Sequence, residues 1–298
     1  MKKPYRTQAV RDLHWALTSP LLMSGECVVD PSLRQSQAAK YQGILREFDR
    51  RGSALDRAHA EVRSTSLGTY FEALVATWID EIPTTRLAAT NWQVYGGGGR
   101  TVGEFDLLFE RGRQPWHWEL AVKFYLGHPA EDGQFRWHDP NCRDRLDRKW
   151  AKMRGQQLRL AEHGAARRAL ETLGFDRDPI SRALIAGYLF VPLESKFDVT
   201  FGPDINRRAP RGWWCWRSGL SQYRDNLDPR GERRWMTVAK PRWLSPVRAS
   251  DEDRLFEFDE FCDRLSSRNA VMVAGLERDE FGWVEDTRGF VVHDDWPY

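Results

Sequence analysis

Cysteine and long apolar runs are both scarce in this sequence of 298 residues. Its four cysteines lie far apart and form no CxxC pair, so we expect reduced thiols and no zinc module. No apolar run reaches the roughly 18 residues that a membrane-spanning helix needs. Arg11, Asp12 and His14 interrupt the apolar positions that follow the basic N-terminus. We therefore expect a cytoplasmic protein with no signal peptide and no membrane partner.

Signatures of common small-molecule enzymes are also missing. The sequence contains no GxGxxG, GxSxG or HExxH motif. The four glycines at 96–99 are not followed by the GK[ST] of a P-loop, so we interpret them as a flexible turn and not as a phosphate cradle. We therefore expect no nucleotide cofactor.

Charge is distributed unevenly, although the formal net charge is only +2. Residues 143–168 carry nine Lys or Arg against three acids, and residues 249–298 carry fourteen acids against five Arg. A basic segment is typical of proteins that bind a polyanion, because Lys and Arg supply most of the affinity for phosphate. A solvated surface balanced by the acidic tail is the alternative.

Two segments that are present carry most of the polar chemistry. The patterns of residues 102–109 and 116–124 predict two β-strands joined by a short turn. Because side chains alternate along a strand, Glu104 and Asp106 share one face of the first strand. The opposite face of the second strand is aromatic and apolar, which predicts a core face. Its polar face carries His117, Glu119, Ala121 and Lys123.

Two helices are predicted to flank these strands. Apolar residues recur at helical spacing over 66–82, and Glu72 lies beside that stripe. The pattern over 143–163 predicts a second helix, with Gln157 inside its apolar stripe and Lys149 on its flank. A buried amide needs partners. Gln157 therefore either bonds to a nearby loop or points, with Lys149, toward the carboxylates.

The remaining pattern predicts an α/β protein with a mixed sheet, because a helix separates the third and fourth strands and permits a parallel crossover. The C-terminal part interleaves Trp and Arg, which either stack on unpaired bases or form a Trp-rich core with Arg at its rim. The other predicted elements are helices at 10–17, 31–51 and 253–266, and strands at 91–95, 183–192, 271–274, 281–284 and 289–292.

Several motifs resemble a known family. They are DLHW at 12–15, GEFDLL at 103–108, ELAVKFYL at 119–126 and GYLF at 187–190. At whole-chain level the sequence resembles the bacterial family called Domain of Unknown Function 1853. The order of elements over about 66–192 resembles the PD-(D/E)XK nuclease superfamily.

The resemblance implies a restriction-endonuclease-like mixed β-sheet flanked by helices. Residues 1–192 would comprise a helical N-terminal segment and the nuclease-like core at about 66–192. Residues 193–298 would form an aromatic-rich α+β extension, packed on the core and not an independent domain.

The superfamily resemblance also implies a catalytic site. Asp106 would hold Mg²⁺ or Mn²⁺ beside Lys123, and Glu72 and Gln157 match two further motif positions. The chain departs from the pattern at position 121, where an alanine replaces the expected carboxylate. Glu119 shares that face but is roughly 6.5–7 Å further along the strand, whereas hard cations bind oxygens at about 2.0–2.6 Å. Either the site is inactive, or another acid takes the role: Glu72, Glu104 or Glu119.

We therefore predict a metal-dependent nuclease with DNA as the favoured substrate. The alternative is a non-catalytic module that binds nucleic acid or another protein through the same fold. The sequence does not indicate an oligomeric state. The residues predicted to contact nucleic acid are Arg145, Lys149, Lys152 and Arg154.

Overall fold

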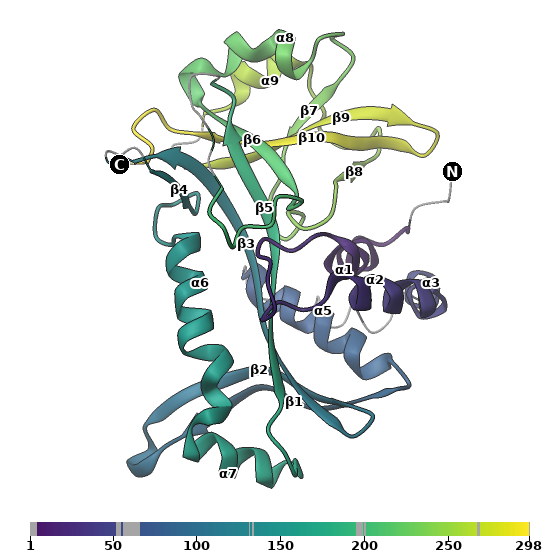
Figure 1. Cartoon of the computed structure of the whole chain (residues 1–298). Helices are drawn as coiled ribbons and strands as arrows, with labels where there is room; N and C mark the ends of the chain where they lie inside the picture. Colours follow the sequence, from purple (N-terminus) through teal and green to yellow (C-terminus); the bar gives the residue numbers. More distant parts are fainter. Residues whose placement is uncertain are drawn as a thin grey trace. The chain divides into compact units, whose positions relative to one another are not determined.

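The chain is a mixed α/β protein (Figure 1). The computed structural model describes residues 5–51, 55, 66–130, 132, 134–194, 199, 201–266 and 269–297. Within these residues there are eight α-helices and ten β-strands. None of the helices in this part of the chain is long and apolar enough to cross a bilayer.

The chain divides into two compact units that are discontinuous in sequence. Unit 1 comprises Met1–Val122, Arg148–Ala186 and Asp204–Arg208, and unit 2 comprises Lys123–Asp147, Gly187–Pro203 and Ala209–Tyr298. The predicted extension 193–298 thus contributes residues to both units. Strands β3 (Gln114–Pro129) and β5 (Ile180–Pro192) also have residues in each.

Helix α5 (Leu67–Glu81) confirms the helix predicted over 66–82. Ser66 is its N-cap residue, and Phe71, Leu74 and Trp78 on its apolar stripe are buried. Its partner α1 (Gln8–Thr18) is tied to it by the Tyr70 hydroxyl, which donates to Asp12 Oδ2 at 2.9 Å. These contacts fix the helix that carries Glu72.

The segment predicted as one helix over 31–51 forms two. They are α2 (Pro31–Lys40), which Asp30 caps through Ser32 N, and α3 (Gln42–Arg51). The break falls at Tyr41, whose backbone (φ −102°, ψ 25°) departs from helical geometry.

Three antiparallel strands of unit 1 confirm the predicted strands around the polar motifs. β1 (Thr85–Tyr95) pairs with β2 (Thr101–Arg111), which pairs with β3. The turn between β2 and β3 is only two residues long, and its Gly112 has φ +65°. Leu107 lies opposite Trp118 in this register. Both faces of β3 are buried around this point, so its polar residues lie in the interior.

The prediction of one helix over 143–163 was wrong. The α-helix α6 runs only from Leu146 to Gly155, a 3₁₀ segment η2 (Gln157–Glu162) follows, and α7 (Gly164–Thr172) comes next. Gly155 weakens helix propagation, and Gln156 (φ −130°, ψ −60°) leaves the helical region. Gln157 therefore begins a new turn and does not lie in a continuous stripe.

Unit 2 has a core of aromatic side chains. Trp214 and Trp235 are fully buried, and Trp235 packs in a T-shaped arrangement against Phe258. This confirms the Trp-rich core that was one of the two interpretations. The sheet is mixed. The pairs β5–β6 and β6–β10 are parallel, whereas β9 pairs antiparallel with both β10 and β7. Further elements of this unit are β4 (Phe135–His138), β6 (Arg211–Trp216), η3 (Arg217–Tyr223), α8 (Arg224–Leu227), β7 (Arg234–Thr237), β8 (Arg248–Ala249), α9 (Phe258–Arg264), β9 (Val271–Asp279) and β10 (Gly282–Val292).

Two C-terminal predictions need correction. The strands predicted at 281–284 and 289–292 are one strand, β10, which pairs with β9 across Glu285–Arg288 with a register shift. Polar residues there obscured the apolar pattern of a continuous strand. The helix predicted over 253–266 is shorter than expected, because only α9 (Phe258–Arg264) is helical there.

Candidate active site: a buried carboxylate pair

Asp106 and Glu119 meet inside unit 1. The paired part of β2 and β3 ends at Leu107 and Trp118, and Asp106 and Glu119 are the next residues beyond it. Asp106 Oδ2 accepts a hydrogen bond from Leu120 N at 2.8 Å. The two carboxyl groups interact, and their interaction raises the pKa of Asp106 and lowers that of Glu119. Glu119 is 1% exposed. Two interacting acids are destabilising when they are taken out of water, so this pair is costly to bury.

The raised pKa values of both carboxyl groups reflect that cost. Burial, and then the Glu119 charge, raise the pKa of Asp106 to about 7. Burial also raises the pKa of Glu119 to about 7, and the charges of Glu72 and Glu104 add to this. Because the two groups interact, they titrate as one pair. A proton or a cation is needed to hold them together near neutral pH.

Glu72 and Glu104 complete the predicted set of acids in the same unit. Burial raises the pKa of Glu72 to about 7, and the charges of Asp106 and Glu104 add to it. The Asn91 side chain hydrogen-bonds to Glu72 and lowers its pKa. Glu104 is half-buried on β2. These two acids act on the pair through their charge.

Gln157 and Lys149 lie beside the pair. Gln157 Nε2 donates to Glu119 Oε1, and Lys149 Nζ donates to Gln157 Oε1 at 3.2 Å. The Lys149 charge lowers the pKa of both Glu119 and Glu72. Of the two orientations open for Gln157, the structure shows the one directed at the carboxylates. Lys149, predicted as a nucleic-acid contact, is the amine of this cluster.

Lys123 has a different partner. Its ammonium donates to Asp144 Oδ2 at 2.8 Å, and the Tyr125 hydroxyl donates to the same oxygen at 3.0 Å. Burial opposes ionisation of Asp144, but these two hydrogen bonds lower its pKa. All three residues belong to unit 2. The structure thus places the predicted catalytic lysine in an ion pair of its own.

His117 is a member of the cluster that the sequence reasoning put on the polar face of its strand but gave no role. It is fully buried, and its Nε2 lies 3.4 Å from Glu119 Oε2. Neither of these two atoms has a hydrogen-bond partner. Its Nδ1 lies 3.1 Å from Ser181 Oγ. Burial lowers the pKa of His117 to about 4, so the imidazole is neutral at pH 7. Its position two residues before Glu119, on the same face, was the available signal.

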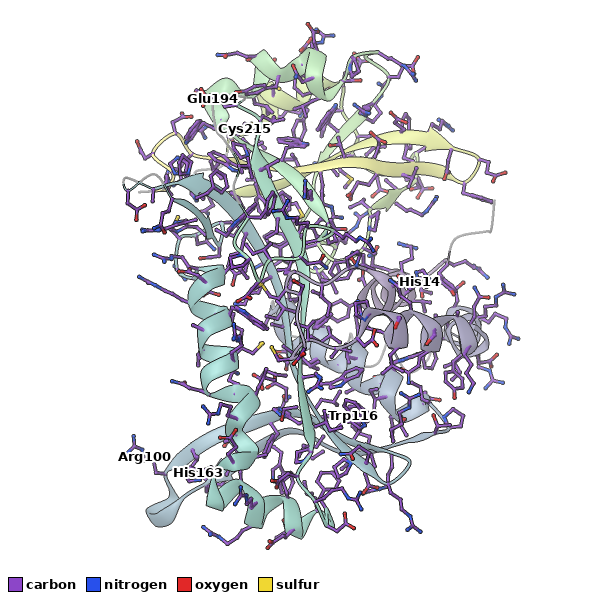
Figure 2. The ribbon with its side chains drawn as sticks, in the orientation of Figure 1. His14, Arg100, Trp116, His163, Glu194 and Cys215 are labelled. Carbon is purple, nitrogen blue, oxygen red and sulfur yellow. The ribbon has the colours of Figure 1, made fainter. Side chains whose placement is uncertain are left out.

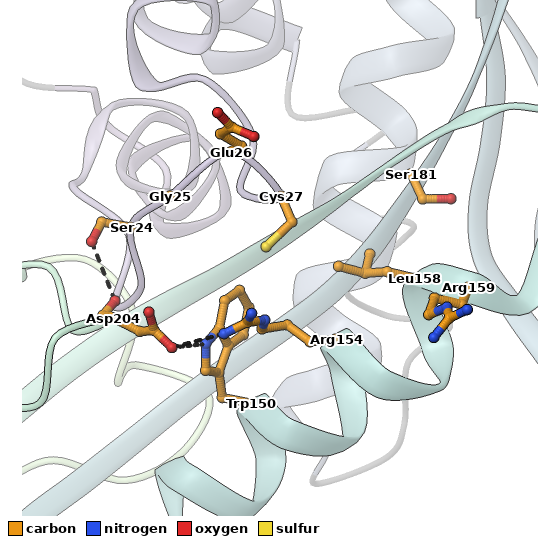
Figure 3. A pocket seen from close by; sticks show the side chains of 10 residues that line it. All are labelled: Ser24, Gly25, Glu26, Cys27, Trp150, Arg154, Leu158, Arg159, Ser181 and Asp204. Atoms are coloured by element: carbon orange, nitrogen blue, oxygen red, sulfur yellow. Dashed lines mark hydrogen bonds and ion pairs between the residues drawn. The ribbon is translucent and has the colours of Figure 1, made fainter.

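A pocket of about 500 Å³ lies in the same unit, and Ser181 lines it (Figure 3). Trp150 Nε1 and Arg154 Nη1 both donate to Asp204 Oδ2, each at 2.9 Å, and Cys27 is also on the wall. The pocket lining carries Arg154 and Arg159 against Glu26 and Asp204, so its charges balance.

The residues predicted to contact nucleic acid have varied surroundings. Arg145 is paired with Asp147, and Arg154 with Asp204. Lys152 is exposed on α6. Ion pairing weakens the attraction of Arg145 and Arg154 for phosphate, which leaves Lys152 as the most available cation of the four.

The donor set restricts which metal site is possible. In the described part of the chain, no group of three or more His, Cys, Asp or Glu side chains is arranged to hold a metal ion. Mg²⁺, however, commonly binds one or two carboxylates and completes its shell with water and substrate phosphate. Asp106 and Glu119 supply two carboxylates, and Glu119 Oε2 lacks a hydrogen-bond partner. The pair therefore fits a hydrated cation and not an all-protein cage.

Comparison with known families identifies the family to which the chain belongs. Residues 11–292 match the family model described as a domain of unknown function, DUF1853. The chain belongs to the DUF1853 family. No curated protein and no solved structure matches it significantly. The chemistry of this DUF1853 member therefore has to be inferred from its own side chains.

Proposed function

We propose that this DUF1853 protein is a divalent-metal-dependent phosphodiesterase of the PD-(D/E)XK type that cleaves DNA. The observation that carries the proposal is the hydrogen-bonded series from Lys149 through Gln157 to Glu119, whose carboxylate acts directly on that of Asp106. The polar set that such a reaction requires is formed by a carboxylate pair from β2 and β3, an amine from α6 and an amide from η2.

Each residue has a distinct role in this proposal. Asp106 and Glu119 would hold Mg²⁺ or Mn²⁺, which when bound polarises the scissile phosphate and lowers the pKa of a water molecule. Gln157 orients the Glu119 carboxylate through Oε1. Lys149 supplies positive charge beside the carboxylates, where the attacking water and the phosphate would lie. Glu72 and Glu104 increase the negative potential that attracts the cation.

This assignment accounts for the alanine at position 121. The second carboxylate comes from Glu119, because its charge acts directly on Asp106. The amine is that of Lys149 on α6, because the Lys123 ammonium is already bonded to Asp144. A restriction-endonuclease-like fold class is part of the same proposal.

The non-catalytic alternative has one observation in its favour. The lysine of the superfamily pattern is occupied by Asp144, as expected if the site had lost its chemistry. In that case the protein would bind DNA with an affinity that falls with salt, but would not cut it.

Cleavage by paired lysine variants distinguishes these assignments. Single- and double-stranded DNA are incubated with Mg²⁺ or Mn²⁺ and with the wild type, Lys149→Met or Lys123→Met, after urea unfolding has shown that each variant is folded. We expect Lys149→Met to lose about 100-fold or more in rate, the usual scale for removing a charge-stabilising group, and Lys123→Met to retain activity. Loss of cleavage in Lys123→Met alone would instead assign the role of the catalytic amine to Lys123 on β3. Absence of cleavage by the wild type, with salt-dependent binding intact, would favour the non-catalytic alternative.

A further inference from the structure

A second pocket of unit 1 is lined by hydrogen-bond donors. It has a volume of about 620 Å³ and is lined from α2, from the turn that joins α5 to β1, and from the end of β2. Figure 2 shows Arg100 and Trp116 toward opposite ends of β2, and Arg111 places the pocket at the end where Trp116 lies. Every side chain of the lining can donate a hydrogen bond: Ser36, Gln37, Lys40, Tyr41, Thr84 and Arg111.

The lining carries positive charge with no acid to balance it. Its two cations are Lys40, which is exposed, and Arg111, which is half-buried at the end of β2. Within the part of the chain that the structure describes, neither forms an ion pair, and Glu110, which precedes Arg111, is paired with Arg86. The pocket of Figure 3 holds two acids against its two arginines, whereas here the unbalanced cations attract an anion.

The hydroxyl groups of the lining lie close to both cations. The Tyr41 hydroxyl is 3.5 Å from Thr84 Oγ1, and Lys40 Nζ is 5.2 Å from the centroid of the Tyr41 ring. The hydrogen bond with Thr84 has the largest effect in lowering the pKa of Tyr41, and the charges of Lys40 and Arg111 lower it further. Donors from α2, from the turn and from β2 are therefore grouped around the Tyr41 hydroxyl.

Gln37 adds an amide that lacks a partner in the protein. The residue is only 8% exposed, yet its side chain makes no hydrogen bond to any residue that the structure describes. Its amide atoms are not sealed from solvent, so they reach the pocket that Gln37 lines. Leaving a buried amide unpaired costs free energy, which a bound hydrogen-bond acceptor would recover.

The charges and donors of this pocket favour a phosphate monoester over a carboxylate. A phosphate monoester carries a charge of about −1.5 to −2 at pH 7 and presents three acceptor oxygens, whereas a carboxylate has a single charge and two oxygens. Two cations and four neutral donors match the first ligand better. The guanidinium of Arg111 also has the fork geometry that binds phosphate oxygens in pairs. The volume is that of a small-molecule site, which leaves room for the organic group that carries the phosphate.

We propose that this pocket binds a small phosphate monoester, whose oxygens would accept hydrogen bonds from Arg111, Lys40 and Gln37. The three hydroxyl groups of the lining would complete the set of donors. This inference does not rest on the proposed function, because Arg111 is roughly 16 Å from Asp106 along β2 at the usual strand rise. A ligand held here would not touch the carboxylate pair.

Isothermal titration calorimetry in EDTA at low salt tests the site with inorganic phosphate, thymidine 5′-monophosphate and acetate, after urea unfolding has shown that each variant is folded. Arg111→Met should bind the monophosphate about 10-fold or more weakly, because it loses charged hydrogen bonds. For Lys40→Met we expect about 3- to 5-fold, because an exposed charge is screened. Gln37→Leu changes no charge and should weaken binding about 2- to 10-fold. Arg100→Met is the matched control, since it removes an exposed cation at the opposite end of β2, and it should stay within about twofold of the wild type.

Several results would overturn the proposal. They are no binding of phosphate or the monophosphate by the wild type, unchanged affinity in Arg111→Met and Gln37→Leu, an equal loss in Arg100→Met, or acetate bound as tightly as phosphate. A thymidine trinucleotide with and without a 5′-phosphate identifies the source of the ligand. Tighter binding of the phosphorylated trinucleotide than of the monophosphate would assign the pocket to a DNA end, and the reverse order to a free ester; both support a phosphate site. None of these outcomes depends on cleavage, so failure here leaves the proposed phosphodiesterase to its own test.

Discussion

Asp106→Asn should stabilise the metal-free protein at alkaline pH. The substitution removes one charge from the pair but keeps an oxygen that accepts the hydrogen bond from Leu120 N. It therefore isolates the electrostatic cost of burying two acids together. Asp144→Asn is the matched control, because the pKa of Asp144 is lowered by Lys123 and Tyr125 and its charge is stabilising.

The magnitude follows from the pKa of Asp106, which rises from 3.8 to about 7. At 1.36 kcal/mol per unit, a shift of roughly three units corresponds to about 4 kcal/mol. We count it once, because Asp106 and Glu119 titrate as a pair. Below pH 4 both the folded and the unfolded protein are protonated at Asp106, so there is no penalty. Between pH 4 and 7 the folded state binds more protons, so stability falls as pH rises, and the full penalty applies above pH 7.

Urea unfolding in EDTA at pH 5 and pH 8 measures this effect. We expect the wild type to lose stability from pH 5 to pH 8, and Asp106→Asn to exceed it at pH 8 by up to about 4 kcal/mol. Asp144→Asn should be less stable than the wild type at pH 8. A wild type that is equally stable at both values, together with an Asp106→Asn variant no more stable at pH 8, would refute the reasoning.

Two further predictions concern the core of unit 2. In Gly187→Ala the new Cβ would lie 1.7 Å from the Lys123 carbonyl oxygen, at a residue with φ +144°, so we expect urea unfolding to show a loss of at least about 3 kcal/mol. Arg288 donates to Glu285 Oε2 at 2.8 Å and to the Ser245 carbonyl at 3.0 Å, and Arg288→Met would leave Glu285 as a buried unpaired charge. A fall in stability of about 3–5 kcal/mol is expected in thermal unfolding, and a change below about 1 kcal/mol would contradict the importance of this pair.

The elements around the site were predictable where the local pattern is strong. The apolar stripe of α5 and the alternation in β2 and β3 follow from periodicity within each segment, and these patterns placed Glu72, Asp106 and Glu119 on the correct elements. The turn at Gly112 left little freedom in how β2 and β3 pair. Local signals therefore determined most of the carboxylate cluster.

The misassigned features depend on contacts that sequence spacing does not reveal. Lys123 is held by Asp144, which is 21 residues away along the chain. The helix containing Lys149 ends at Gly155, although apolar residues continue beyond it. His117 is buried because both faces of β3 are covered, whereas its strand pattern resembles that of a half-exposed strand. Tertiary packing decided each of these cases.

Calorimetric titration with Mn²⁺ at pH 7.5 tests most directly whether Asp106 and Glu119 form a cation site. The wild type and Asp144→Asn should each bind one ion with similar affinity, and Asp106→Asn should lose that binding. Equal binding by Asp106→Asn and the wild type, or no binding by the wild type, would contradict a metal-dependent role for this carboxylate pair.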